Sequence, residues 1–263
     1  MEIITYILAS LIGLSLGLIG GGGSIITVPV LVYIGSIDPI TSTAYSLFVV
    51  GSTSLVGAYS KMNEGFVDVK TAFLFGIPSI ITVYLTRAFL IPSLPEILTN
   101  INGVEITKDL GIMLLFSVVM LLASVSMIRE KKNINRSNEV SPNYLLIIIE
   151  GVVVGTLTGI VGAGGGFLII PALVLFLGLE MKKAVGTSLL IIAMKSLIGF
   201  MGDLQSNLEI DWSFLLLFSA ISIAGIFIGN RLSKQIAGEK LKKAFGWFVL
   251  IMAVYILVKE LYL

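Results

Sequence analysis

One basic residue lies in the middle of an otherwise uncharged apolar stretch. Lys195 stands near the centre of residues 184–202. A charge at membrane depth is costly, so such a residue is a functional candidate by default. Its ammonium could hold an anion, or release a proton if desolvation disfavours the charged form. Ser188 shares its helix face, with Thr187 near the edge. The alternative is structural: Lys195 pairs with an acidic residue such as Glu150 and only holds helices together.

Two glycine clusters could bind an anion through their backbone. Each cluster interrupts an apolar stretch and is followed by residues 25–34 or 167–176, the length of a half-membrane helix. The clusters read Gly20-Gly21-Gly22-Gly23-Ser24 and Gly162-Ala163-Gly164-Gly165-Gly166. Unwound backbone at membrane depth is tolerated only inside protein or beside a wet cavity. The N-terminus of the helix after each break offers free N–H groups and the positive end of the dipole, which suit an anion. Alternatively, the glycines only allow close helix packing, which is what we expect of Gly13/Gly17 and Gly155/Gly159.

The pattern occurs twice. Residues 13–60 recur at 155–202 in register, 142 positions further along, so that Ser46 and Thr53 correspond to Ser188 and Lys195. A duplicated glycine break within hydrophobic segments is typical of secondary transporters built from two repeats. The predicted substrate-binding residues are Gly20, Gly22, Gly23, Ser24, Ser46, Thr53, Gly162, Gly164, Gly165, Gly166, Thr187, Ser188 and Lys195. The candidates for ion coupling are Glu150 and Lys195.

Composition defines the class of protein. The chain is 56% hydrophobic and 13% charged, whereas soluble domains are about 25% charged. This predicts a polytopic membrane protein in a lipid bilayer. With no cysteine and no histidine, thiol chemistry, zinc sites and imidazole catalysis are excluded, and we expect no metal and no cofactor. A net charge of +1 without a basic, aromatic surface gives no support for nucleic-acid binding.

Loop charges predict the topology. Six segments are expected to span the membrane as ordinary helices: 42–60, 68–91, 110–128, 184–202, 212–230 and 244–262. Cytoplasmic loops carry the excess of Lys and Arg, so the basic linker 129–142 and the basic loop 231–243 are placed inside. Segment 143–178 must then begin and end in the cytoplasm as a hairpin. By the same logic, segment 3–35 is a hairpin from outside, and the N-terminus lies outside.

The predicted fold is therefore an all-α polytopic membrane protein with two inverted-topology repeats, each a glycine-broken helical hairpin plus three transmembrane helices. Repeat 1 covers 1–128, the cytoplasmic linker 129–142, and repeat 2 covers 143–263. Arg87 and Arg231, near helix ends, are expected to reach the lipid headgroups. Asp68 and Asp211 are expected to cap the helices that they begin.

The motifs resemble those of a known family. They run from Gly159-Ile-Val-Gly-Ala-Gly-Gly-Gly-Phe-Leu-Ile-Ile-Pro171 through Ala184-Val-Gly-Thr-Ser-Leu189 and Ser196-Leu-x-Gly199 to Ile210-Asp-Trp212. A looser counterpart lies between Gly17 and Gly57. The sequence resembles the TauE/SafE family of sulfite and organosulfonate exporters over nearly its whole length. The resemblance implies a secondary carrier, coupled to a proton or sodium gradient, that exports sulfite or a sulfonate such as sulfoacetate across a prokaryotic plasma membrane.

The residues leave other readings open. A passive anion channel would use the same site, and sulfate or a carboxylate would also fit it. An intramembrane enzyme is disfavoured because no pair of acidic residues is placed for acid–base work. A scaffold subunit is a further alternative. Gly225 and Gly229 form a GxxxG-type surface compatible with a homodimer. The direction of transport and the coupling ion are not encoded in these patterns.

Overall fold

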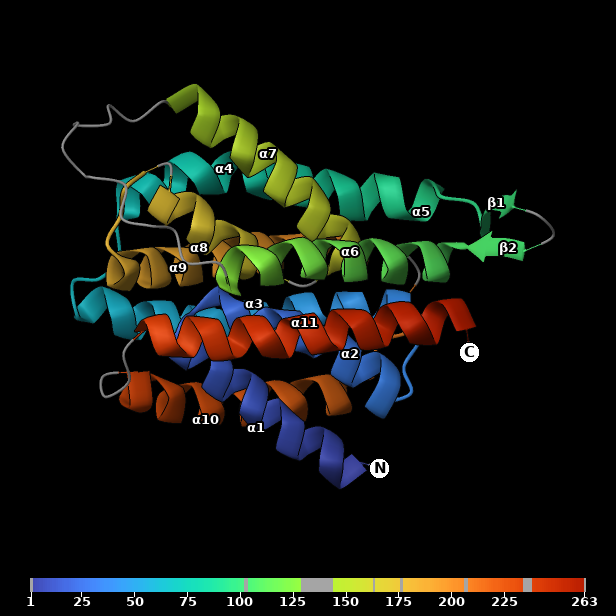
Figure 1. The fold of residues 1–263 in the computed structure, drawn as a ribbon, viewed down its shortest axis with the longest axis horizontal. Helices are drawn as coiled ribbons and strands as arrows, with labels where there is room; N and C mark the ends of the chain where they lie inside the picture. Colours follow the sequence, from blue (N-terminus) through green and yellow to red (C-terminus); the bar gives the residue numbers. More distant parts are fainter. Residues whose placement is uncertain are drawn as a thin grey trace.

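The computed structural model describes residues 2–101, 104–128, 144–162, 164–175, 177–205, 208–233 and 238–262. The linker 129–142 lies outside the described residues. Apart from one short strand pair, the described chain is helical, and most helices run along the long axis of the molecule (Figure 1). The predicted all-α class is therefore confirmed.

The first half of the chain contains α1 (Glu2–Ile19), η1 (Gly21–Ile26), α2 (Thr27–Pro29), η2 (Val30–Ile34), α3 (Pro39–Asn63), α4 (Val69–Leu85), η3 (Thr86–Leu90), α5 (Ile91–Ser93), β1 (Ile97–Ile101), β2 (Val104–Thr107) and α6 (Lys108–Ile128). The second half contains α7 (Tyr144–Val161), α8 (Gly166–Leu175), α9 (Met181–Asp203), α10 (Trp212–Ser233) and α11 (Gly238–Tyr262). Strands β1 and β2 pair antiparallel and were not predicted from the sequence.

Within the described residues, five helical segments are long and apolar enough to cross a membrane: Pro39–Asn63, Val69–Ser93, Lys108–Val125, Met181–Asp203 and Trp212–Ser233. They coincide with five of the six predicted spans, and α11 covers the sixth. Their outward side chains are largely apolar, as the hydrocarbon of a bilayer requires. The chain is a multi-pass membrane protein.

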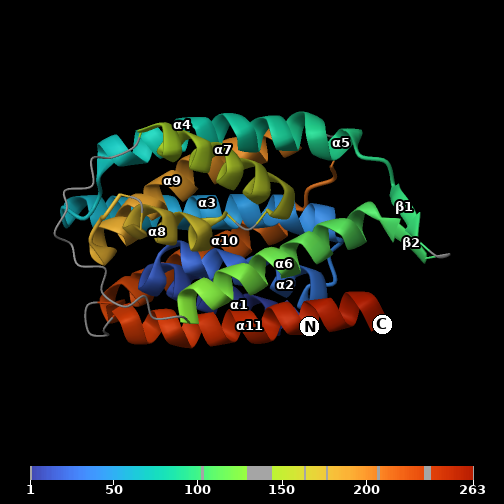
Figure 2. The same cartoon turned by 45° about the horizontal axis from the view of Figure 1, so that its top comes forward.

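Both glycine clusters reverse the chain. Helix α1 starts at the end of the molecule that carries β1 and β2, and η2 returns to that end; α7 starts at the opposite end, and α8 returns there (Figures 1 and 2). The turns begin at Gly20 and Gly162, whose φ angles are 73° and 72°. Side chains with a Cβ rarely adopt this left-handed region, which is why glycine is needed at these two positions.

Each first arm packs against a helix from the other half of the chain. Helix α1 lies on α10, where Gly13 and Gly17 allow contact with the α10 backbone at Ser222 and Ile226. Helix α7 lies on α4 in the same way. There, Gly155 contacts Ser79 and Thr82, and Gly159 contacts Thr86. The prediction that these glycine pairs serve close packing is confirmed. Helices α3 and α9 cross between the two pairs, and α6 packs on α11.

Asp68 and Asp211 cap α4 and α10, as predicted. The Asp68 carboxylate accepts a hydrogen bond from the N–H of Thr71 at 3.0 Å, and the Asp211 carboxylate accepts one from Phe214 at 3.0 Å. A carboxylate in this position satisfies a free N–H and complements the helix dipole.

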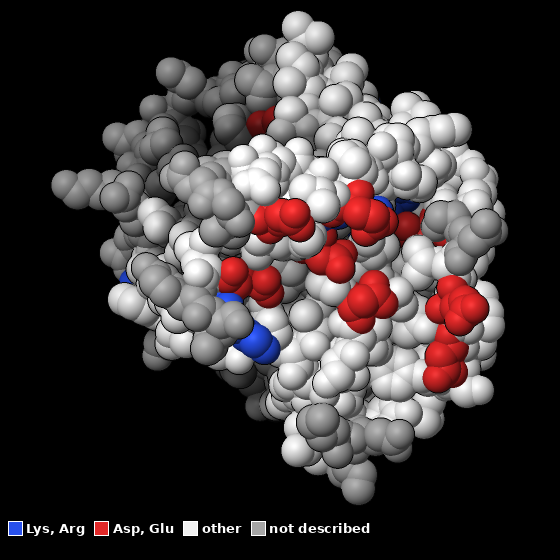
Figure 3. Space-filling view, turned by 90° about the vertical axis from the view of Figure 1, so that its right-hand side faces the viewer, with Lys and Arg blue, Asp and Glu red and all other residues white. Residues whose placement is uncertain are grey.

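The end of the molecule with β1 and β2 is acidic. Figure 3 shows Asp and Glu side chains well in excess of Lys and Arg over its described surface. Asp38, Glu96 and Glu260 all lie close enough to Asp109 to act on it electrostatically. The described surface of this end of the membrane protein is therefore mainly acidic.

Candidate functional site

The two glycine breaks meet in the interior. Gly21 of the first break and Gly166 of the second lie backbone against backbone, and a Cβ on either would overlap the Cα of the other. Ile192 of α9 covers both, with its Cδ1 placed 2.5 Å from where each Cβ would be. The N-terminal ends of η1 and α8 are thus brought together, although they come from opposite halves of the sequence.

Lys195 reaches this junction. It is 1% exposed, and its Nζ donates a hydrogen bond to Oγ1 of Thr158 in α7 at 3.0 Å. A Cβ on Gly165 would lie 2.7 Å from Nζ, so the ammonium lies directly on the second break. No ion pair joins Lys195 to Glu150 or to another residue that the structure describes. The ammonium has three N–H donors and bonds Thr158 with one, so it has donor capacity left for a further acceptor.

Matching residues of α3 and α9 flank the two turns. Gly20 contacts Val185 and the hydroxyl of Ser188 in α9, and Gly162 contacts Thr43 in α3. Thr43 and Val185 occupy corresponding positions of the sequence repeat. Each break therefore rests on the long helix of the opposite half, and the structure brings Ser188 to the first turn.

Several of the predicted hydroxyls face the interior without a bond of their own. Ser46 and Thr53 of α3 are fully buried, and their oxygens have no hydrogen-bond partner in the described part of the chain. Ser24 and Ser188 instead donate within their own helices, to the carbonyls of Gly21 and Val185.

Thr187 is engaged elsewhere. Its Oγ1 accepts a hydrogen bond from the N–H of Asp68 at 2.9 Å, so it helps to begin α4 rather than facing the junction. Of the remaining predicted glycines, Gly164 lies beside Val50 and Ser24, Gly23 packs on Ser15 and Leu16, and Gly22 lies within η1.

Glu150 lies away from the junction. It is two turns before Thr158 on α7 and partly exposed, and its Oε2 has no hydrogen-bond partner in the described residues. It shares a helix with the partner of Lys195 but does not contact Lys195 itself. The structural alternative of a Lys195–Glu150 pair is therefore wrong.

Sequence reasoning missed Thr158 and a set of buried hydroxyls. These hydroxyls have no partner among the described residues and fall in two corresponding pairs, Ser54 with Ser196 and Ser79 with Ser222. Ser54 and Ser196 belong to the Ser-Leu-x-Gly motif of both repeats. The recurrence of a serine inside two apolar helices was the available signal.

The prediction for Arg87 is wrong. Its side chain does not reach the headgroups; it is 1% exposed and donates through Nη1 to Oγ1 of Thr43 at 2.9 Å and to Oδ1 of Asp203 at 3.3 Å. Asp203 is the last residue of α9 and is itself buried. A guanidinium whose charge is balanced inside the protein does not need to extend to the interface.

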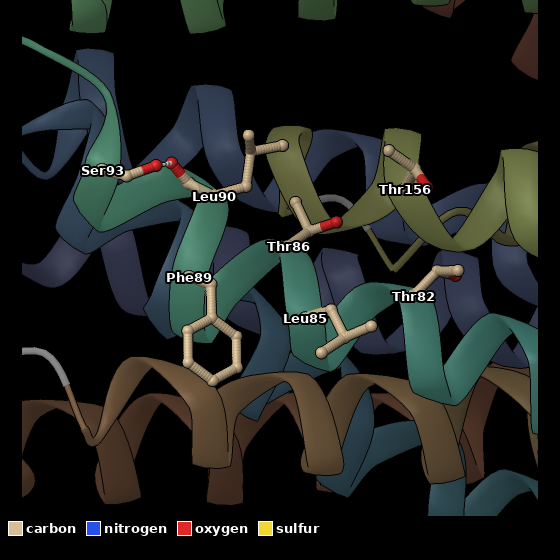
Figure 4. Close-up of a pocket in the computed structure, with 7 residues that line it drawn as sticks. All are labelled: Thr82, Leu85, Thr86, Phe89, Leu90, Ser93 and Thr156. Carbon is tan, nitrogen blue, oxygen red and sulfur yellow. Dashed lines mark hydrogen bonds between the residues drawn. The ribbon is translucent and has the colours of Figure 1, made fainter.

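Two hollows open on the surface. One, of about 470 Å³, lies between α4–η3 and α7. Figure 4 shows Thr82 and Thr86 on one side of it and Thr156 on the other. The second, of about 410 Å³, is lined by Ser60, Glu64, Phe227, Ile228, Asn230 and Arg231. Neither hollow is lined by a break residue or Lys195, so the junction is closed to both in this conformation.

Comparison with known proteins finds a family and relatives that cover nearly the whole chain. The sequence pattern that defines the family described as "Sulfite exporter TauE/SafE" matches residues 5–256. A "Probable membrane transporter protein" of Xylella fastidiosa (strain 9a5c) is 28% identical over 261 residues, 97% of this chain and 94% of that protein. The "Probable membrane transporter protein YdhB" of Bacillus subtilis (strain 168) is 27% identical over 238 residues, 89% of this chain and 91% of that protein. The "Probable membrane transporter protein MJ0441" of Methanocaldococcus jannaschii is 25% identical over 265 residues, 95% of this chain and 93% of that protein. No solved structure matches the chain.

Proposed function

The chain belongs to the TauE/SafE family of membrane transporters, and on that basis we propose that it exports a small sulfur-containing anion, sulfite or an organosulfonate such as sulfoacetate, across the plasma membrane of a prokaryote. It is a transporter and not an enzyme. The observation that carries the substrate class is the junction of Gly21 with Gly166, against which the Lys195 ammonium lies.

The chemistry of the junction suits an oxyanion. Two helix N-termini present N–H groups and the positive ends of their dipoles, and Lys195 adds a full positive charge. Helix α3 contacts the second break through Thr43 and Val50, and it also carries Ser46 and Thr53, whose buried hydroxyls have no partner in the described residues. The three oxygens of sulfite or a sulfonate head group match such a set of N–H and O–H donors. A neutral solute would leave the buried ammonium unneutralised, which favours an anion.

The carrier works by alternating access between two inverted repeats, 1–128 and 143–263. In support, contacts between the two halves of the chain come in equivalent pairs. Gly13 contacts Ser222, as Gly155 contacts Ser79, and Gly57 contacts Leu189, as Gly199 contacts Leu47. Inverted repeats that meet at discontinuous helices near the midplane are typical of secondary transporters. Motion of the hairpins 3–35 and 143–178 against the other helices exposes the junction first to one side and then to the other.

The acidic end is the outer face. Short cytoplasmic loops carry an excess of Lys and Arg, and the end opposite β1 and β2 has Lys70, Lys182 and Arg231. The N-terminus then lies outside and the linker 129–142 inside. A proton or sodium ion driving export is part of this proposal, with Glu150 and Lys195 as its candidate carriers.

Uptake of labelled sulfite and sulfoacetate into proteoliposomes tests the proposal, with vesicles left empty or preloaded with unlabelled anion. We expect saturable uptake that preloading accelerates, and we expect Lys195→Met to reduce it by at least about tenfold, since a charge-assisted hydrogen bond contributes about 1.5–3 kcal/mol. Flux that neither saturates nor responds to preloading would indicate a channel instead. If sulfate or a carboxylate is carried and both sulfur anions are not, the substrate class is wrong.

A further inference from the structure

Arg87 has more hydrogen-bonding capacity than its neighbours use. Nη1 is bound to Thr43 and Asp203, while Nε and Nη2 are buried and have no hydrogen-bond partner in the described part of the chain. Burying donor groups without acceptors costs free energy, and a guanidinium is the group best shaped for a planar or tripod oxyanion. A residue that only joined α4 to α9 would be expected to turn these nitrogens toward an acceptor.

The surroundings connect Arg87 to the central junction. Thr43, which accepts from Arg87, is also the residue against which the turn at Gly162 packs. Asp203 follows Lys195 by eight residues on α9, a rise of about 12 Å along the helix axis. An anion that leaves Lys195 toward the acidic end therefore meets Arg87 as the next buried cation among the described residues on α3, α4–η3 and α9.

The corresponding positions of the other half make a different arrangement. Asn230 follows the cap Asp211 by nineteen residues, as Arg87 follows the cap Asp68, and Lys61 follows Thr53 by eight residues, as Asp203 follows Lys195. These two corresponding residues, Asn230 and Lys61, do not bond each other. Lys61 instead pairs with Glu64 at 3.3 Å, and both polar atoms of the Asn230 side chain are buried without a partner in the described residues. The second hollow opens beside Asn230. Arg87 and Asp203 are thus bonded at the acidic end, while the corresponding residues at the other end, Asn230 and Lys61, are not.

We propose that Arg87 is a second anion-binding residue, on the exit side of the junction, and that Asp203 occupies its guanidinium when no anion is bound there. This inference rests on the proposed function, because its ligand is the exported oxyanion. When the anion arrives from Lys195, its oxygens bind Nε and Nη2 of Arg87 and displace the Asp203 carboxylate from Nη1. Return of the carboxylate releases the anion to the outer face and closes the path behind it.

Substituting either member of the Arg87–Asp203 ion pair should then change the affinity for sulfite, but in opposite directions. Asp203→Asn removes the competing carboxylate, so the Kd for labelled sulfite, measured on purified protein in detergent, should fall about five- to tenfold while transport slows because release is impaired. Arg87→Met removes the binding group, so the Kd should rise at least about tenfold. Glu96→Gln is the control, because it removes an exposed carboxylate that pairs with Lys108 and should change neither quantity.

A charge exchange separates binding from structure. Arg87→Asp combined with Asp203→Arg restores an ion pair between α4–η3 and α9 but moves the cation away from Thr43. We expect it to recover the melting temperature lost in Arg87→Met without recovering sulfite affinity. The proposal is wrong if the exchange restores transport, or if both single variants leave the sulfite Kd unchanged or weaken it alike. Wild-type protein that neither binds nor carries sulfite or sulfoacetate would overturn the proposed function as well.

Discussion

Gly21 and Gly166 touch through their backbones, with no side chain between them. The contact is possible only because neither residue has a Cβ, and it places the starts of η1 and α8 beside one another. A membrane protein gains little from the hydrophobic effect between its helices, so such close approach supplies much of the packing. We propose that the same contact also gives the transported anion its backbone N–H donors.

Gly166→Ala should damage both folding and transport. The Cβ of the new alanine would overlap the Cα of Gly21. Overpacking of this kind lowers the free energy of unfolding by about 1–3 kcal/mol. We expect a lower melting temperature in detergent and transport reduced about tenfold or more, because the two break ends are forced apart. The control is Gly76→Ala, where the nearest atom is the flexible Met194 Cε at 3.3 Å. Equal transport in both alanine variants would contradict a role for the contact.

Gly165→Ala can be compared with a matched glycine. Gly165 and Gly178 have φ angles of 63° and 64°, so alanine introduces similar backbone strain at both. Only at Gly165 would the new Cβ meet Thr158 and, at 2.7 Å, Nζ of Lys195; around Gly178 there is nothing within 4 Å. The sulfite Kd should therefore rise in Gly165→Ala and stay unchanged in Gly178→Ala. A rise in both would assign the effect to strain alone.

The sequence was sufficient for the features that depend on local pattern. Hydropathy and length located the spans, and glycine spacing located both the turns and the packing surfaces of α1 and α7. It was insufficient where a residue depends on a partner far along the chain. Arg87 can be buried because it pairs with Asp203. Thr187 does not face the junction because its hydroxyl accepts a hydrogen bond from the N–H of Asp68. Neither pairing leaves a periodic signal, because each arises only when helices from opposite halves pack together.

Lys195→Met should leave the protein at least as stable as the wild type. A buried cation without an ion pair is destabilising, and methionine fills a similar volume without that cost. The melting temperature in detergent should therefore stay the same or rise, while sulfite binding weakens. Thr158→Val is the companion variant, because it removes the hydrogen-bond acceptor of Lys195 and retains the charge. A sharp fall in stability for Lys195→Met would instead identify Lys195 as a structural residue.

Tyr45 and Thr187 make equivalent hydrogen bonds at the starts of α10 and α4, and each should contribute a similar amount to the free energy of unfolding. The Tyr45 hydroxyl accepts from the N–H of Asp211 at 2.6 Å, as Thr187 accepts from the N–H of Asp68. Tyr45→Phe and Thr187→Val should each lower the free energy of unfolding by about 0.5–1.5 kcal/mol. Because the sites are far apart, the double variant should show the sum. Tyr59→Phe, at a side chain 65% exposed, is the control and should have no effect.

The absence of native cysteine makes the topology directly testable. Lys70, Lys182, Glu105 and Glu209 are all exposed, the two lysines at the basic end and the two glutamates at the acidic end. Single substitutions to cysteine can be treated with a membrane-impermeant maleimide on intact cells. Glu105→Cys and Glu209→Cys should be labelled at once, and Lys70→Cys and Lys182→Cys only after the membrane is permeabilised.

Segment 143–178 lies between Lys70 and Lys182 along the chain. Two further helices, α4 and α6, also separate these lysines, so labelling of both from one side requires 143–178 to cross an even number of times. Labelling of Lys70→Cys and Lys182→Cys from opposite sides would make that segment a single crossing and remove the inverted repeats.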